Sequence, residues 1–186
     1  MNLQELRESV KKTLPEKRYQ HTLGVEETST ILANRYGVDE KKAKISALLH
    51  DIAKNQTYNE MREQLIQAGE VSYLEYSSLV WHAPVGALVA KEQYLIEDEM
   101  ILNAIKYHTT GRPAMSTLEQ LIFLADFIEP GRTQPNVEMI RNLATESLEK
   151  AVARVLSDTI AYLSSKGEGA IHPDTLAACE FYRHYL

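Results

Sequence analysis

The sequence predicts an all-α fold, a single domain in which seven to nine helices pack as a bundle. Three observations predict it. Apolar residues recur with helical spacing along most of the chain, and helix-capping residues, glycines and prolines divide that pattern into segments of helical length. Alternating strand patterns are nearly absent, since the one short candidate covers residues 71–76. A chain of 186 residues fits one domain over 1–186.

The first two helices come from simple amphipathic patterns. Leu3, Leu6 and Val10 share one face of a short opening helix. A second helix is expected over about 15–36, because its first residue is a proline, which the first turn of a helix tolerates. Gly37 then provides a left-handed position at which that helix ends.

The next two helices begin at capping residues. Asp39 is a good N-cap for a third helix that should reach residue 54. Thr57 and Glu60 have the spacing of a capping box, and Gly69 ends that fourth helix. The remaining helices are expected over 84–95, 98–108, 116–128, 136–165 (one long helix or two) and from 173 onward.

Composition and charge exclude several classes of protein. The net charge of −6 argues against bulk electrostatic binding to duplex nucleic acid or to an anionic membrane surface. The single cysteine, Cys179, rules out an internal disulfide and a cysteine-rich zinc site. The longest apolar run, 121–128, is interrupted by Asp126 and is too short to cross a bilayer, and the charged N-terminus is unlike a signal peptide. We therefore expect a cytoplasmic protein with no nucleic-acid duplex or membrane as partner, and a homodimer is compatible with the sequence.

Six polar residues occupy inward helix faces and suggest a metal site. His50 shares a helix face with the small, apolar Ala43 and Ala47. The other five residues of the set follow it directly, lie on an apolar helix face or lie at the start of a helix. Taken singly, a histidine there is more often a hydrogen-bonded core residue, and Asp126 could pair with an arginine. Together they are hard to place in a core, because an unpaired buried carboxylate costs several kcal/mol. The set comprises His21, His50, Asp51, His82, His108 and Asp126.

Imidazole and carboxylate ligands suit iron, manganese, zinc or cobalt better than magnesium or calcium. Six ligands suffice for two ions that share one carboxylate, and paired ions can activate a hydroxide and hold a phosphoryl group. Asp51 is the best bridging candidate, because its neighbour His50 binds one ion and its two oxygens can reach both.

Cationic and hydroxyl side chains surround these six positions in the sequence. Lys54 lies four residues after His50, where it would neutralise charge on a phosphoryl oxygen or, equally well, be a solvated end-of-helix lysine. Arg18, Arg112 and Arg132 could hold a polyphosphate, although a surface arginine is the default for each one. Thr109 and Thr110 form a small polar loop that could offer hydroxyl groups to a phosphate.

The ordered residues resemble a known family. His21, the pair His50-Asp51 and Asp126 match the H…HD…D signature of the HD superfamily of metal-dependent phosphohydrolases. The segments RYQHTLGV, ALLHDIAK, WHAPVGA, YHTTGRP, ADFIEPGR and IHPDT are similar to those of the YqeK-like family. The resemblance covers nearly the whole chain. It implies an HD-domain helical bundle, and the activity of that family is symmetrical hydrolysis of diadenosine tetraphosphate.

The resemblance also implies roles for individual residues. It implies that the core metal, iron in this family, is held by His21, His50, Asp51 and Asp126, and that His82 and His108 complete a second metal position or contact phosphate. The catalytic residues would be Asp51, Lys54, His82 and His108. The nucleotide-binding residues would be Arg18, Lys54, Ala83, Thr109, Thr110, Arg112, Arg132, His172 and Thr175. One or two divalent ions are expected, with manganese, cobalt or zinc as alternatives to iron.

The functional hypothesis is therefore a metal-dependent hydrolase. A metal-bound hydroxide would cleave a dinucleoside polyphosphate between its central phosphates and leave two nucleoside diphosphates of the ADP or GDP type. Three alternatives stay open at this point. They are a nucleotidase or phosphodiesterase acting on mononucleotides, a di-iron oxygenase, and a helical nucleotide-binding module without turnover.

Overall fold

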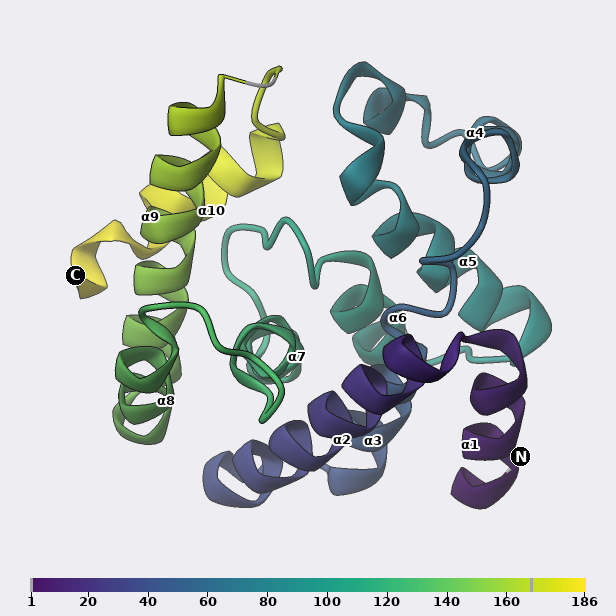
Figure 1. The fold of residues 1–186 in the computed structure, drawn as a ribbon, viewed down its shortest axis with the longest axis horizontal. Coiled ribbons are helices and arrows are strands. Elements are labelled where there is room, and N and C mark those ends of the chain that lie inside the picture. Colours follow the sequence, from purple (N-terminus) through teal and green to yellow (C-terminus); the bar gives the residue numbers. More distant parts are fainter. Residues whose placement is uncertain (1, 168) are drawn as a thin grey trace.

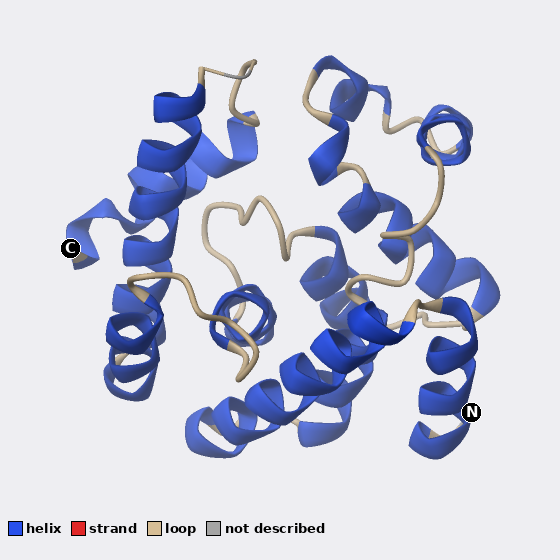
Figure 2. Ribbon diagram, viewed as in Figure 1, coloured by secondary structure: helices blue, strands red, loops and turns tan. Residues whose placement is uncertain are grey.

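A computed structural model describes residues 2–167 and 169–186, and the regular structure within them is entirely helical (Figure 2). This confirms the predicted fold class. The described chain forms ten α-helices in an irregular bundle (Figure 1). Their bounds are α1 Leu3–Thr13, α2 Glu16–Tyr36, α3 Glu40–Leu49, α4 Tyr58–Gln67, α5 His82–Gln93, α6 Glu99–Lys106, α7 Thr117–Ile128, α8 Val137–Glu146, α9 Leu148–Lys166 and α10 Pro173–Tyr182. Three short 3₁₀ helices are η1 Val71–Glu75, η2 Ser78–Val80 and η3 Arg183–Tyr185.

The predicted caps account for many of the helix boundaries. The side chains of Thr57 and Ser116 each accept a hydrogen bond from the backbone three residues later and form complete capping boxes. Gly37 ends α2 in the left-handed conformation, with φ of 67°, which costs a glycine little. Such local hydrogen bonds satisfy backbone groups that a helix end otherwise leaves unpaired.

The third helix is shorter than predicted. It ends at Leu49 rather than at residue 54, and His50 is its C-cap. Beyond it, Lys54 N donates to Asp51 O at 2.9 Å, so the chain continues in tighter turns with hydrogen bonds spanning three residues rather than four. His50, Asp51 and Lys54 therefore do not share one α-helical face, and each is oriented by this turn.

Two other segments differ from the expected elements. Residues 71–75 form a 3₁₀ helix rather than a strand, with Tyr73 N donating to Glu70 O and Tyr76 N donating to Tyr73 O. The stretch 136–165 divides into α8 and α9 at Ser147, which is extended and caps α9. That division is one reason why the described chain has ten helices where seven to nine were expected.

Helix α7 is the centre of the molecule. It packs against α2, α3, α6, α8 and α9, and Figure 1 shows it end-on between α8–α10 on one side and α1–α6 on the other. Nine of its twelve residues are buried, as expected for a helix that is apolar on every side. Its carboxyl end delivers Asp126 to the interior. No helix within the described ranges is both long and apolar enough to span a bilayer.

Candidate metal centre and nucleotide cavity

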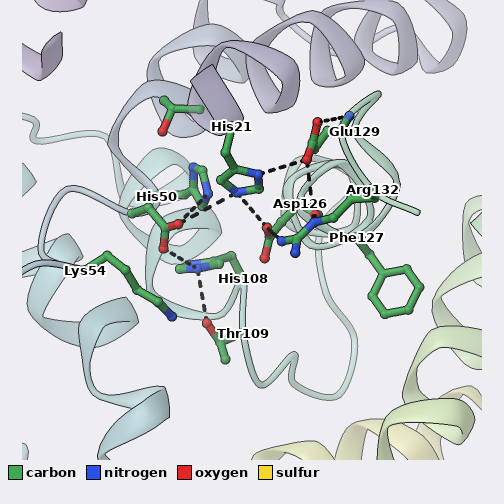
Figure 3. A network of polar contacts seen from close by, with 12 residues as sticks. His21, His50, Lys54, His108, Thr109, Asp126, Phe127, Glu129 and Arg132 are labelled. Carbon is green, nitrogen blue, oxygen red and sulfur yellow. Dashed lines mark hydrogen bonds and ion pairs between the residues drawn. The ribbon is translucent and has the colours of Figure 1, made fainter. Parts of the chain in front are cut away.

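Five separate parts of the chain deliver polar side chains to one interior site. Helix α2 provides His21, the turn after α3 provides His50 and Asp51, and α5 begins at His82. His108 lies just after α6, and Asp126 lies in the last turn of α7. The structure thus brings together all six residues that the sequence predicts as metal ligands, and Figure 3 shows several of them facing a common centre.

The Asp51 carboxylate lies between two pairs of imidazoles. Its Oδ2 atom is 3.8 Å from His21 Nε2 and 3.4 Å from His50 Nε2. Its Oδ1 atom is 3.3 Å from His82 Nε2 and 3.7 Å from His108 Nε2. Each carboxylate oxygen therefore faces its own pair of ring nitrogens, which is the arrangement that a bridging ligand requires.

Hydrogen bonds orient three of these rings. His50 Nδ1 donates to Ala47 O at 2.6 Å, and His108 Nδ1 donates to Ile105 O at 2.8 Å. His21 Nδ1 donates to the Glu129 carboxylate at 3.1 Å. Carbonyl and carboxylate oxygens only accept, so Nδ1 carries the proton in each neutral ring and Nε2 presents its lone pair to the centre.

The Nε2 lone pairs of these rings are arranged so that a bound cation would satisfy them. His21 Nε2 and His50 Nε2 are buried and have no hydrogen-bond partner within the described chain. His21 Nε2 also lies 3.0 Å from Asp126 Oδ1, so two atoms that bear lone pairs face each other. Ligand atoms of His21, His50 and Asp126 all lie within 4.8 Å of one another, as do those of His50, Asp51 and His108. Burying such groups is costly unless a proton or metal ion lies between them.

Electrostatics around the site point the same way. Burial raises the pKa of the Asp51 carboxyl, but the neighbouring His50 and His108 lower it by more, so its net pKa is well below the usual value. Burial lowers the pKa of His50, but Asp51 and Asp126 raise it by more, so these carboxylates favour a positive charge beside them. Burial lowers the pKa of His82, and the nearby His108 and Lys54 lower it again. At neutral pH, Asp51 is therefore an anion and His82 a neutral imidazole, which are the protonation states of metal ligands.

Cationic side chains lie against the ligating carboxylates. Arg18 Nη1 is 2.8 Å from Asp51 Oδ2, and Arg132 Nη2 is 2.6 Å from Asp126 Oδ1. Lys54 Nζ lies 3.2 Å from both ring nitrogens of His82, and burial lowers the pKa of its amine. All three belong to the predicted nucleotide-binding set, and all three lie at the edge of the site.

A cavity of about 310 Å³ adjoins one side of the site. Thr109 connects the two, because its Oγ1 atom is 3.1 Å from His108 Nε2 and also lines the cavity. His172 and Thr175 line it as well, and the His172 ring stacks on Tyr73 with centroids 4.8 Å apart. These three residues of the predicted nucleotide-binding set therefore surround one hollow of a size suited to a nucleoside.

Three other predicted nucleotide contacts lie elsewhere. Ala83 is fully buried in α5, and the buried Thr110 hydroxyl donates to Gly111 O. Arg112 donates from Nε and Nη2 to the buried Glu119 at 2.5 and 2.9 Å, and its guanidinium lies over the Tyr107 ring. The structure does not bring these side chains to the cavity, and their roles in nucleotide binding stay predictions.

Sequence reasoning missed Glu129. It is the C-cap of α7 and is buried, and its carboxylate accepts hydrogen bonds from His21 and from Gly131 N. The available signal was a second carboxylate three residues after Asp126, directly before a proline and a glycine that end the helix.

Comparison with known proteins identifies the family that shares this sequence. The model of the HD domain family matches residues 18–131. The chain is 47% identical to the symmetrical bis(5'-nucleosyl)-tetraphosphatase of Halalkalibacterium halodurans over 95% of each chain. It is 42% identical to the protein of the same name from Bacillus subtilis over 94% of each, and 39% identical to that of Staphylococcus aureus over 99% of this chain and 96% of the relative.

A solved structure is similar over the full length. It is described as a predicted HD superfamily hydrolase involved in NAD metabolism, from Clostridium acetobutylicum. The TM-score is 0.91 at 36% identity, with 100% of this chain and 99% of the other covered. The helical arrangement described above is therefore shared with a protein whose structure has been solved.

Proposed function

This chain belongs to the HD domain family, and from that premise we propose that it is a symmetrical bis(5'-nucleosyl)-tetraphosphatase. It would cleave diadenosine tetraphosphate, and related dinucleoside polyphosphates, into two nucleoside diphosphates. One observation carries the proposal. The Asp51 carboxylate, flanked by two pairs of imidazoles, lies beside a cavity of nucleoside size. Relatives that bear this enzyme name align over almost the whole chain.

The metal that we propose is iron, as one or two divalent ions. The residues that would hold it are His21, His50, Asp51, His82, His108 and Asp126. When bound, such an ion supplies a hydroxide nucleophile near neutral pH and neutralises phosphoryl oxygens. Manganese, cobalt and zinc have similar ligand preferences, and metal analysis of the purified protein distinguishes them from iron.

Three cationic side chains beside the metal ligands are placed to bind a polyphosphate. The Lys54 amine is beside His82 and its lowered pKa reflects burial, so its charge is poorly screened and acts strongly on a nearby phosphoryl oxygen. The guanidinium groups of Arg18 and Arg132 each use part of their donors on a ligating carboxylate and retain others for phosphate oxygens. A net acidic protein would thus attract its anionic substrate through local charge.

The cavity beside Thr109 would hold one nucleoside. Its walls combine the apolar side chains of Val80 and Leu163 with the hydroxyl groups of Thr109 and Thr175. Such a mixture suits a flat base and a sugar, because apolar walls bury the base and a few polar groups fix its orientation. His172 is placed at this wall by its stacking on Tyr73.

Product analysis tests the proposal. Protein loaded with iron, manganese, cobalt or zinc is incubated with diadenosine tetraphosphate, and nucleotides are separated by anion exchange. ADP as the only product is the expected result, with metal content measured in parallel. ATP together with AMP would contradict symmetrical cleavage. Turnover of mononucleotides alone would indicate a nucleotidase, and ADP binding without any hydrolysis would indicate a binding module.

A further inference from the structure

A second cavity lies on the other side of the metal-ligand cluster. It measures about 470 Å³ and shares no lining residue with the nucleoside cavity. We call it the cationic cavity, because three of its side chains are positively charged and one ligand histidine reaches it. The lining residues used below are Lys17, Arg18, His21, Asn55, Glu129 and Arg132.

The two cavities meet the cluster from opposite sides of Asp51. The nucleoside cavity reaches it through Thr109, which is beside His108 on the Oδ1 side of the carboxylate. The cationic cavity reaches it through His21 and Arg18, which lie on the Oδ2 side. Figure 3 shows the same separation, with Thr109 on one side of the cluster and Arg132 with Glu129 on the other.

A symmetrically cleaved substrate has two equal halves, and one cavity accommodates only one of them. We propose that the cationic cavity binds the second nucleoside diphosphate half, the half that leaves. This inference rests on the proposed function. In the cleavage, the oxygen of water forms a bond to the phosphorus of the half held beside Thr109. The bridging oxygen departs with the bonding electron pair as part of the other diphosphate, and the protons of water are released or shared with the products.

The charges of the cationic cavity match that role. A departing diphosphate gains negative charge as the bridging bond breaks, and Arg18 and Arg132 are already within hydrogen-bond distance of the ligating carboxylates. Lys17 is an exposed lysine in the first turn of α2, on the outer part of the cavity. Its amine is placed to attract the phosphates of the departing half without contacting the metal ligands. The Asn55 amide can form a hydrogen bond with the sugar or the base of that half.

Charge reversal at Lys17 tests the site. Lys17→Glu is expected to raise KM for diadenosine tetraphosphate about tenfold. Equilibrium dialysis with labelled ADP should count two ADP per wild-type chain and one per Lys17→Glu chain. The matched control is Lys91→Glu, which reverses an exposed lysine on α5 that lines neither cavity.

The outcomes separate this inference from the proposed function. If the wild type forms only ADP but Lys17→Glu behaves like Lys91→Glu in both KM and stoichiometry, the second half binds elsewhere and the inference is wrong. If the wild type forms no ADP from the dinucleotide, the proposed function itself has failed. Metal content should be equal in all three proteins.

A different observation assigns a role to Glu129. Two of the oriented rings, His50 and His108, donate Nδ1 to backbone carbonyls, whereas His21 donates to a carboxylate. Glu129 is 5% exposed, and its other oxygen accepts from Gly131 N at 2.5 Å. The carboxylate is thus held from two directions.

The surrounding backbone leaves room for this carboxylate and little else. A Cβ atom on Gly24 would lie 2.6 Å from Glu129 Oε2, and one on Gly131 would lie 3.0 Å from both carboxylate oxygens. We infer that Glu129 is a positioning residue, which sets the tautomer and the ring orientation of His21 and makes its Nε2 a stronger ligand. Carboxylate partners of ligand histidines typically change metal affinity about 10–100-fold.

Metal binding tests this role directly. Glu129→Gln preserves size, and we expect it to raise the metal dissociation constant about 10–100-fold in a chelator competition. The absorption bands of the cobalt-loaded protein should shift as well, because the ligand field at His21 changes. Gly24→Ala should weaken binding in the same direction by displacing the carboxylate.

Glu138→Gln is the matched control, since Glu138 is exposed on α8 and pairs with Arg141, away from the metal ligands. Thermal unfolding of the metal-free proteins shows whether each variant is folded. A folded Glu129→Gln protein with the affinity and cobalt spectrum of the wild type would show that Glu129 has no positioning role.

Discussion

The two ends of α7 carry polar groups that are satisfied in different ways. At the amino end, Glu119 accepts two hydrogen bonds from Arg112 and one from Ser116 N at 2.8 Å. At the carboxyl end, the half-buried Asp126 also pairs with an arginine, Arg132, but it faces His21 Nε2, a buried nitrogen with no hydrogen-bond partner within the described chain. The chain completes the Glu119 carboxylate by itself, whereas the lone pair of His21 Nε2 is left for an external cation. Buried polar groups that are complete support the fold, and incomplete ones indicate a ligand.

Removal of the central carboxylate should have the largest effect on the metal-ligand cluster. Asp51→Ala should abolish metal binding and lower ADP formation by on the order of 10³-fold or more, because the four facing ring nitrogens lose their shared anion. Metal analysis of the purified protein and the product assay measure both. Asp158→Ala, at a partly exposed ion pair on α9, is the control. Full metal content in Asp51→Ala would refute the bridging role.

A substitution beside the cluster should separate chemistry from metal binding. Lys54→Ala removes a cation that contacts His82 and is not itself a ligand. We expect turnover to fall about 10²-fold while metal content stays unchanged, since one charge that stabilises the transition state is lost. Loss of metal in parallel with turnover would instead show that Lys54 supports the ligands. Single-turnover measurements at saturating substrate give the comparison.

The amino end of α7 should respond in stability. Arg112→Ala leaves the buried Glu119 carboxylate with fewer partners, so the free energy of unfolding should fall by about 1–3 kcal/mol. Urea denaturation measures this, and metal content should not change. The predicted nucleotide contact of Arg112 gives the opposite pattern, an increase in KM for the dinucleotide with unchanged stability.

The smallest expected effect concerns His172 beside the nucleoside cavity. Burial lowers its pKa from the ordinary 6.5, and its Nδ1 accepts a hydrogen bond from Asp174 N, which requires the unprotonated nitrogen. Above pH 6.5 neither the folded nor the unfolded chain carries this proton, so the full stability is present. Below it, the unfolded chain binds the proton first, and stability is lost as the pH falls toward the folded-state pKa.

The expected loss is less than about 1 kcal/mol between pH 6.5 and 5.5, because one group that titrates over a single pH unit contributes at most about 1.4 kcal/mol and the unfolded chain is already half protonated at pH 6.5. His172→Asn keeps a capping side chain but cannot titrate, so its unfolding free energy should fall less over that interval. Urea denaturation of the metal-free proteins at each pH measures the difference. Equal losses in both proteins would show that other groups cause the pH dependence.

Much of the fold followed from local chemistry that the sequence displays. The capping boxes at Thr57 and Ser116 and the glycine that ends α2 involve residues three or four positions apart, so they can be recognised without tertiary information. The six candidate ligands were also recognisable, because histidines and acids on apolar helix faces are costly without a partner. Local rules missed the turn after Leu49, where the hydrogen bonds change from four-residue to three-residue spacing.

The all-helical fold, its caps and the type of ligand set could be predicted from residue identity and short spacing. Which atoms come into contact depends on how the helices pack. This packing places Asp51 between two pairs of rings and connects Thr109 with His172, far along the chain, in one cavity. It also brings Glu129 to His21 across 108 positions of sequence. Packing of α2 against α7 sets that contact, and no local propensity encodes it.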